Sequence, residues 1–152
     1  NQALEKLASA LSTSMQYSGI AAIGKLADTG SNAIAREAGA SAKFEIYFPD
    51  DVSSGNVNIL DVTGNVLRTM PIGATDAGVA QYTWDGKNNN GIDLGEGIYY
   101  VESAYTKTDG TSATARVGLY PIESIKFDGG TTYAKLGSSY VDFSTIKEVT
   151  GI

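Results

Sequence analysis

Residues 97–120, GIYYVESAYTKTDGTSATARVGLY, decide the fold of this chain. Two runs rich in β-branched and aromatic residues, 97–108 and 111–120, flank the pair Asp109-Gly110. An Asp-Gly pair between such runs is typical of a β-hairpin, because both residues tolerate the backbone conformations of a tight turn. The stretch therefore predicts two antiparallel strands joined by a short turn.

Four further strands are expected before this hairpin. They occupy residues 43–48, 56–62, 66–72 and 79–85. In the first of them, Phe44, Ile46 and Phe48 alternate with more polar neighbours, which is the period of a strand with one buried face. Six strands separated by turn residues at this spacing predict an antiparallel β-sandwich.

The last part of the chain predicts a second, smaller β unit. Short strand-like runs flank Asp128-Gly129-Gly130, and another run follows Gly137-Ser138-Ser139. These strands are too few for a sandwich, but they suffice for a small barrel or sheet when another hairpin joins them. We expect that hairpin upstream, with strands near residues 23–28 and 32–36.

The expected organisation is therefore one β unit inserted into another. Residues 20–40 and 117–152 would form a discontinuous small barrel, and residues 41–116 the sandwich. Residues 1–18 would form a separate N-terminal element.

Residues 1–18 have the apolar spacing of an amphipathic helix. Leucine, alanine and methionine side chains recur at intervals of three and four, which places them on one helical face. The helix could pack on its own domain, or it could contact another subunit. In the second case the candidate subunit-contact residues are Leu4, Leu7, Leu11 and Met15.

Composition argues against an enzyme. The 152 residues contain neither histidine nor cysteine, so Ser-His-Asp and Cys-His catalysis and zinc sites with the usual ligands are excluded. A net charge of -6 does not suit a nucleic-acid partner, which requires a basic face. We therefore expect no catalytic residue, no cofactor and no metal.

Two acidic groupings are candidate sites. Asp85 and Glu96 have the spacing of the first and last ligands of a calcium loop, but Lys87 stands at the third position, where a ligand is expected. A polar hairpin loop is the better interpretation. Asp50-Asp51 makes a poor catalytic pair, because adjacent side chains at a strand end point apart.

The aromatic residues leave one alternative open. Trp84 is expected in the core, whereas Tyr47, Tyr100 and Tyr140 could be buried or exposed. Exposed aromatic side chains on a sheet can bind carbohydrate or protein. A carbohydrate- or surface-binding module of a secreted bacterial protein is therefore the alternative function, and a carboxylate or Ser-Lys hydrolase is a third.

The run from Asn56 to Tyr105 resembles the FlgD family of flagellar hook-assembly (hook-capping) scaffold proteins. The resemblance rests on the turn Thr63-Gly64-Asn65, on the run Tyr82-Thr83-Trp84-Asp85-Gly86-Lys87 and on Gly95-x-Gly97-Ile98-Tyr99. Segments 20–25 and 125–149 resemble the parts of the family that flank this region.

The resemblance implies a fold and a function. The implied fold is mainly β: a fibronectin type III-like (Ig-like) antiparallel sandwich inserted into a small tudor-like β-barrel, preceded by the N-terminal helix. The implied function is that of a non-enzymatic cap, exported from the bacterial cytoplasm, at the distal end of the growing hook. Its implied partners are the hook protein, further copies of itself and, in transit, the flagellar export apparatus. The family's Gln/Asn-rich N-terminal region is expected to precede Asn1.

Overall fold

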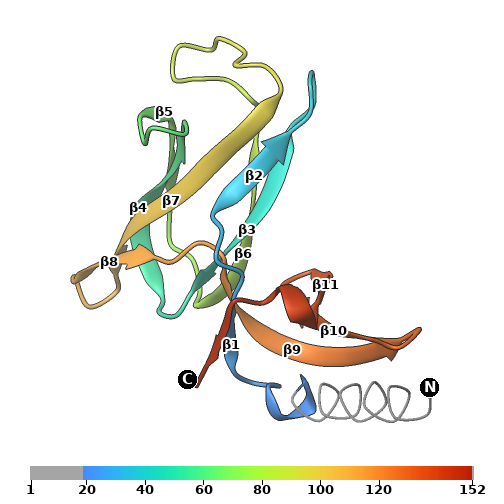
Figure 1. Cartoon of the computed structure of the whole chain (residues 1–152). Coiled ribbons are helices and arrows are strands. Elements are labelled where there is room, and N and C mark those ends of the chain that lie inside the picture. The colour runs from blue at the N-terminus through green and yellow to red at the C-terminus, as the bar shows by residue number, and fades with distance from the viewer. Residues whose placement is uncertain (1–18, 152) are drawn as a thin grey trace, which may run out of the picture. The chain divides into compact units, whose positions relative to one another are not determined.

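A computed structural model describes residues 19–151 of the chain, so the expected helix over residues 1–18, with Leu4, Leu7, Leu11 and Met15, lies outside the described residues. The regular structure of the described part is almost entirely β-strand (Figure 1). It divides into two compact units, and the chain passes between them after Gly30 and again after Gly118. The mainly β fold class is confirmed.

The strands of the larger unit are β2 (Ala33–Arg36), β3 (Ala42–Phe48), β4 (Val52–Leu60), β5 (Val66–Ile72), β6 (Gly78–Trp84), β7 (Gly97–Lys107) and β8 (Ser112–Ala115). The smaller unit contains β1 (Leu26–Asp28), β9 (Leu119–Asp128), β10 (Thr131–Leu136), β11 (Ser139–Asp142), the short 3-10 helix η1 (Phe143–Thr145) and β12 (Glu148–Thr150).

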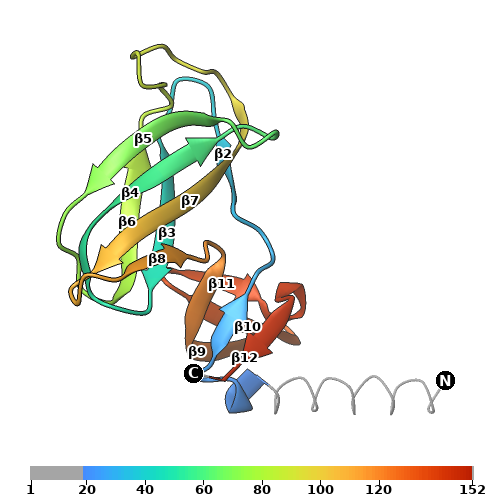
Figure 2. The same ribbon diagram turned by 90° about the vertical axis from the view of Figure 1, so that its left-hand side faces the viewer.

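The larger unit is a sandwich of two antiparallel sheets. One sheet has the order β2-β7-β4-β5, and the other consists of β3 and β6 (Figure 2). The long strand β7 organises the first sheet. One of its edges pairs with β4, while residues 97–100 pair with β2 and residues 103–106 pair with β8. The expected antiparallel sandwich is therefore present.

The core of the sandwich follows the alternation seen in the sequence. In β3 the side chains of Phe44, Ile46 and Phe48 are buried, as predicted for one face of a strand. Trp84 is completely buried and packs edge-on against Tyr99, with 4.8 Å between ring centroids. Its expected place in the core is confirmed.

The Asp-Gly hairpin forms as predicted, but its second strand is shorter. Lys107 N donates to Thr111 O at 2.8 Å, and Gly110 has a φ of 88°. The single strand expected over residues 111–120 is wrong, since β8 ends at Ala115 and β9 begins at Leu119. Gly118, with a φ of 100°, lies in the turn that separates the two strands.

The hairpin expected at residues 23–28 and 32–36 is wrong. Strand β1 pairs with β9 and β12, whereas β2 pairs with β7 of the sandwich. The two strands serve different cores, because Ala27 is buried in the smaller unit and Ile34 packs on the sandwich core. The segment containing β2 therefore belongs with the sandwich and not with the C-terminal strands.

The smaller unit is a five-stranded antiparallel sheet in the order β11-β10-β9-β1-β12. Its core is small and is formed by Ala22, Ala27, Ile122, Ala134 and Leu136. Strands β11 and β12 stand at the two ends of this order, and a tudor-like barrel remains a prediction. Within residues 19–151, no helix has the length and apolar character to cross a bilayer.

Replacing Trp84 with alanine should destabilise the sandwich strongly. The substitution empties a fully buried site, and such changes cost about 3–5 kcal/mol. Urea unfolding followed by far-UV circular dichroism measures the loss. Val62→Ala is the control, because that side chain is 80% exposed and its truncation should change stability by no more than about 0.5 kcal/mol. Equal effects of the two substitutions would contradict the assigned core.

Candidate functional site

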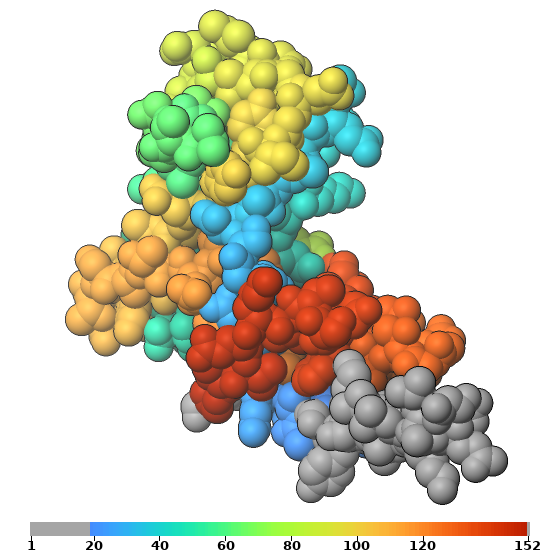
Figure 3. Space-filling view, viewed as in Figure 1, coloured from blue at the N-terminus to red at the C-terminus, as the bar shows by residue number. Residues whose placement is uncertain are grey.

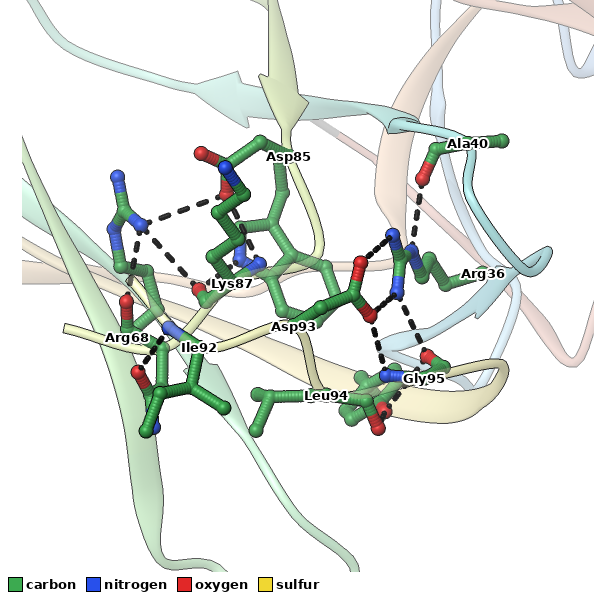
Figure 4. A network of polar contacts seen from close by, with 12 residues as sticks. Arg36, Ala40, Arg68, Asp85, Lys87, Ile92, Asp93, Leu94 and Gly95 are labelled. Atoms are coloured by element: carbon green, nitrogen blue, oxygen red, sulfur yellow. Dashed lines mark hydrogen bonds and ion pairs between the residues drawn. The ribbon is translucent and has the colours of Figure 1, made fainter. Parts of the chain in front are cut away.

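The most elaborate polar site of the described residues is centred on Arg36, at the end of β2 (Figure 4). Its guanidinium binds both carboxylate oxygens of Asp93, with N–O distances of 2.6 and 3.0 Å. Arg36 Nε donates to Ala40 O at 2.8 Å, and Nη1 also donates to Gly95 O at 3.0 Å. The Arg36 side chain is only 2% exposed, so this bidentate pair joins β2 to the loop between β6 and β7.

Gly86 allows the guanidinium to lie against the loop backbone. A Cβ atom at this position would meet the Arg36 guanidinium carbon at 2.1 Å. The residue also has a φ of +81°, a conformation that side chains other than glycine rarely adopt. Both the space and the backbone angle therefore require glycine here.

Further hydrogen bonds fasten the rest of the loop to the sandwich. Trp84 Nε1 donates to Lys87 O at 3.0 Å. Arg68 of β5 lies 3.5 Å from Asp85 and donates to the carbonyls of Lys87 and Asn88 (Figure 4). Since these contacts hold the loop from β2, β5 and β6, the loop is a structural brace.

This geometry explains why the loop does not suit calcium. Both oxygens of Asp93 face Arg36, and Asp85 Oδ1 accepts a hydrogen bond from Lys87 N at 3.0 Å. Throughout residues 19–151, no group of three or more acidic side chains is arranged to hold a metal ion. The polar-loop interpretation matches the contacts.

The second acidic grouping, Asp50-Asp51, also has its two carboxylates bound to different partners. Asp50 lies 3.4 Å from Lys107 Nζ, and Asp51 Oδ1 accepts from Ala77 N at 2.8 Å. The two carboxylates therefore serve separate contacts at the strand end.

The three tyrosines for which the sequence allowed either burial or exposure differ in the structure. Tyr47 and Tyr100 are half-buried, whereas Tyr140 is exposed. Lys126 Nζ lies 4.4 Å from the centroid of the Tyr140 ring, which is within cation–π range. Trp84 is buried, so it cannot contribute to an exposed aromatic surface of the kind that the carbohydrate alternative requires.

A shallow hollow lies on the outer face of the larger sheet. Its volume is about 560 Å³. The lining comes from β4, β5, β7 and β8 and consists mostly of small side chains, including Ser54, Asn56, Ala104 and Thr114. Tyr105 is the one titratable residue of the lining, and burial raises the pKa of its phenol. The hollow offers shape and hydrogen-bonding groups but no acid–base pair.

Two aspartates of the sandwich have strongly lowered pKa values. The hydrogen bond from Arg36 is the main reason that the pKa of Asp93 falls to about 2. Asp61, in the turn after β4, also has a pKa of about 2, chiefly because the Thr63 hydroxyl donates to it. Both carboxylates organise turns and remain charged at neutral pH.

Sequence reasoning did not identify Arg36. The residue was expected in a hairpin of the smaller unit, and nothing in its immediate neighbours indicates a partner 57 positions away. The nearest available signal was one arginine in the otherwise apolar run Ala33–Arg36, since a buried charge needs a partner.

Comparison with known proteins points to one family. Residues 31–109 match the family model described as the FlgD Ig-like domain. A region of 67 residues is 34% identical to the "Basal-body rod modification protein FlgD" of Salmonella typhimurium, and an equally similar protein occurs in Salmonella typhi. This region covers 44% of the chain but only 28% of the length of those relatives.

Several solved structures with a similar fold are FlgD proteins. A truncated FlgD from Helicobacter pylori superposes with a TM-score of 0.77 at 20% identity, covering 87% of this chain and 96% of that one. The structure of FlgD from Xanthomonas campestris, a protein described in connection with the hook capping essential for flagellar assembly, has a TM-score of 0.54 at 24% identity, covering 88% of this chain and 98% of that one. At these identities the likeness shows the fold.

Replacing Gly86 with alanine should destabilise the chain more than the same change at Gly91. Both glycines have a φ of +81°, so both substitutions carry backbone strain of about 1–2 kcal/mol. Only Gly86 also faces Arg36, whereas nothing lies within 4 Å of a Cβ at Gly91. Thermal unfolding of the two variants measures the difference. An equal loss would show that the Arg36 contact contributes nothing.

The Asp93 contribution to stability should disappear in acid. The folded-state pKa of Asp93 is about 2, below the unfolded value of about 3.9, so the unfolded chain binds more protons between these values. The contribution is fully present above the unfolded pKa and is lost as the pH falls through about 2. The stability difference between the native protein and Asp93→Asn should therefore shrink from pH 5 towards pH 2. Urea unfolding at several pH values tests this, and a constant difference would contradict it.

Proposed function

Because the chain belongs to the FlgD family, we propose that it is a non-enzymatic scaffold for assembly of the bacterial flagellar hook. The single observation that carries the proposal is the match of the FlgD Ig-like domain to residues 31–109. In this role the protein would cap the growing end of the hook and guide hook-protein subunits into place.

The architecture of the described residues supports such a role. The polar groups of the cluster around Arg36 and Asp93 bind one another within the sandwich. No buried side-chain nitrogen or oxygen in residues 19–151 lacks a hydrogen-bond partner, so polar capacity is used internally. The remaining features are extended surfaces of two β units, which suit binding to protein subunits.

The proposal includes partners and a location. The hook protein is the proposed partner, and further copies of this chain would form the cap. Residues Leu4, Leu7, Leu11 and Met15 remain the proposed subunit contacts. Passage through the flagellar export apparatus would place the protein at the distal end of the hook. A chain without cysteine has no disulfide to obstruct unfolding in a narrow channel.

Deletion of the encoding gene tests the proposal in the host bacterium. We expect cells without hooks, because exported hook protein would diffuse away instead of polymerising beneath a cap. Electron microscopy of basal bodies and an assay of hook protein in the medium are the readouts. The full-length gene, supplied on a plasmid, should restore hooks. Complete hooks in the deletion strain would contradict the proposal.

The carbohydrate-binding alternative has a separate test. Binding to a glycan array requires an exposed aromatic surface, and Trp84 is buried. We expect no glycan to bind the full-length protein, while reproducible glycan binding would favour the alternative.

A further inference from the structure

The outer face of the larger sheet and the adjoining β4–β5 turn carry an apolar cluster whose margin is exposed. We name it the outer apolar patch and define it by the exposed Val62, Val66 and Ile98, the half-buried Tyr100, and Leu60, which is buried beneath them at 8% exposure. Three of these side chains are largely exposed: Val62 at 80%, Ile98 at 57% and Val66 at 49%. The five members of the patch come from β4, β5 and β7 and from the turn between β4 and β5.

Strand register brings the patch together. Leu60 of β4 pairs with Tyr100 of β7 on one side and with Val66 of β5 on the other. Cross-strand partners share a face of the sheet, with Cβ atoms about 5 Å apart. On the far edge of β7, Ala33 and Ala35 of β2 pair with Tyr100 and Ile98, and their short side chains leave those neighbours uncovered. The row therefore runs across four strands.

Alternation shows that this row faces away from the sandwich core. Ile59 and Val101 are buried in the core and pair with each other. Their chain neighbours Leu60 and Tyr100 point to the opposite face, because successive side chains of a strand alternate. Figure 3 shows the outer surface with the β4–β5 turn in green, β7 in yellow and β2 in blue side by side.

The patch is held rigidly at its ends. In the β4–β5 turn, Asp61 accepts hydrogen bonds from the backbone nitrogens of Thr63 and Asn65, both at 2.9 Å. At the start of β7, the Arg36–Asp93 pair and the bond from Arg36 to Gly95 O hold the loop that leads to Ile98. A surface ordered in advance loses little conformational entropy when a partner binds.

The charges beside the patch are acidic. Asp61 precedes Val62, Glu96 lies two residues before Ile98, and Glu102 follows Tyr100 on the same face of β7. Both arginines of this end are engaged within the sandwich. Arg36 is buried against Asp93, and Arg68 points to Asp85 and the loop carbonyls.

This arrangement indicates the chemistry of the occupant. An acidic border complements a surface with an apolar centre and lysine or arginine around it. A second copy of the chain in a symmetric contact would bring the same acids together, which is unfavourable. The charge pattern therefore favours a different protein with a basic rim.

We infer that the outer apolar patch is the docking surface for the hook protein, through an apolar region of that protein bordered by basic side chains. This inference rests on the proposed function and adds to it a location on the sandwich. Apolar contact supplies the affinity, and the acidic border sets orientation and makes binding sensitive to salt.

Binding of the full-length protein to purified hook protein tests the inference. The patch variant carries Val62→Ser and Ile98→Ser, and the control carries Ile23→Ser and Val149→Ser at exposed apolar positions of the other unit. We expect the patch variant to bind about 10-fold to 100-fold more weakly, because serine buries much less apolar surface against the partner than valine or isoleucine does. The control should bind as the native protein does. Circular dichroism confirms that each variant is folded.

Salt and a charge variant supply a second readout. Raising NaCl from about 50 mM to about 500 mM should weaken native binding several-fold, because ions screen the acidic border. Glu102→Gln should reduce that salt dependence. A native protein that binds hook protein equally well at both salt concentrations would overturn the proposed basic rim.

The outcomes separate this inference from the proposed function. Unchanged binding by the patch variant would overturn the docking surface, while hook loss in the deletion strain would still support the scaffold. Hook-less deletion cells combined with no binding of native protein to hook protein would overturn the choice of occupant. Self-association that the patch variant abolishes, measured by analytical ultracentrifugation, would assign the patch to a second copy and likewise overturn the inference.

Discussion

The bidentate pair between Arg36 and Asp93 is the interaction on which the sandwich's arrangement most depends. It joins the short strand β2 to a loop that lies 57 residues further along the chain. A buried guanidinium is costly unless its donors are satisfied, and here it reaches one carboxylate and the carbonyls of Ala40 and Gly95. The contact therefore fastens β2, which already pairs with β7, to the loop that precedes β7.

This brace has a consequence for the outer surface. The loop that it fixes leads directly into β7, the strand that pairs with β2, β4 and β8. The exposed start of β7 is therefore held by its pairing with β2 and by the loop that leads into it. Rigidity at this end lets a β-sandwich present a defined shape to another protein.

Much of the sandwich could be predicted from local patterns. Alternation in residues 43–48 identified β3, and the Asp109-Gly110 pair identified the β7–β8 hairpin, because both signals lie within a few residues. The place of Trp84 in the core also followed from its position in a strand. These features depend on short-range chemistry that a sequence displays directly.

The errors arose where distant pairing decides the structure. Two short runs near residues 26 and 34 have turn residues between them, which favours a hairpin. In the structure they do not pair with each other: β1 lies between β9 and β12, and β2 pairs with β7. The role of Arg36 could not be predicted for the same reason, since its partner Asp93 lies 57 residues away in the sequence. The outer apolar patch likewise could not be predicted from the sequence, because its members come from three strands and a turn and are brought together only by the strand pairing.

The central claim is that the sandwich acts by presenting its outer face to the subunits of a growing polymer. Photo-crosslinking in live cells tests it most directly, with a photoreactive amino acid at Ile98 of the full-length protein and, as control, at Phe127, another exposed position. The account predicts a crosslinked product containing hook protein from position 98 and none from position 127. Crosslinking of hook protein only from position 127, or from neither position in cells that build hooks, would contradict it.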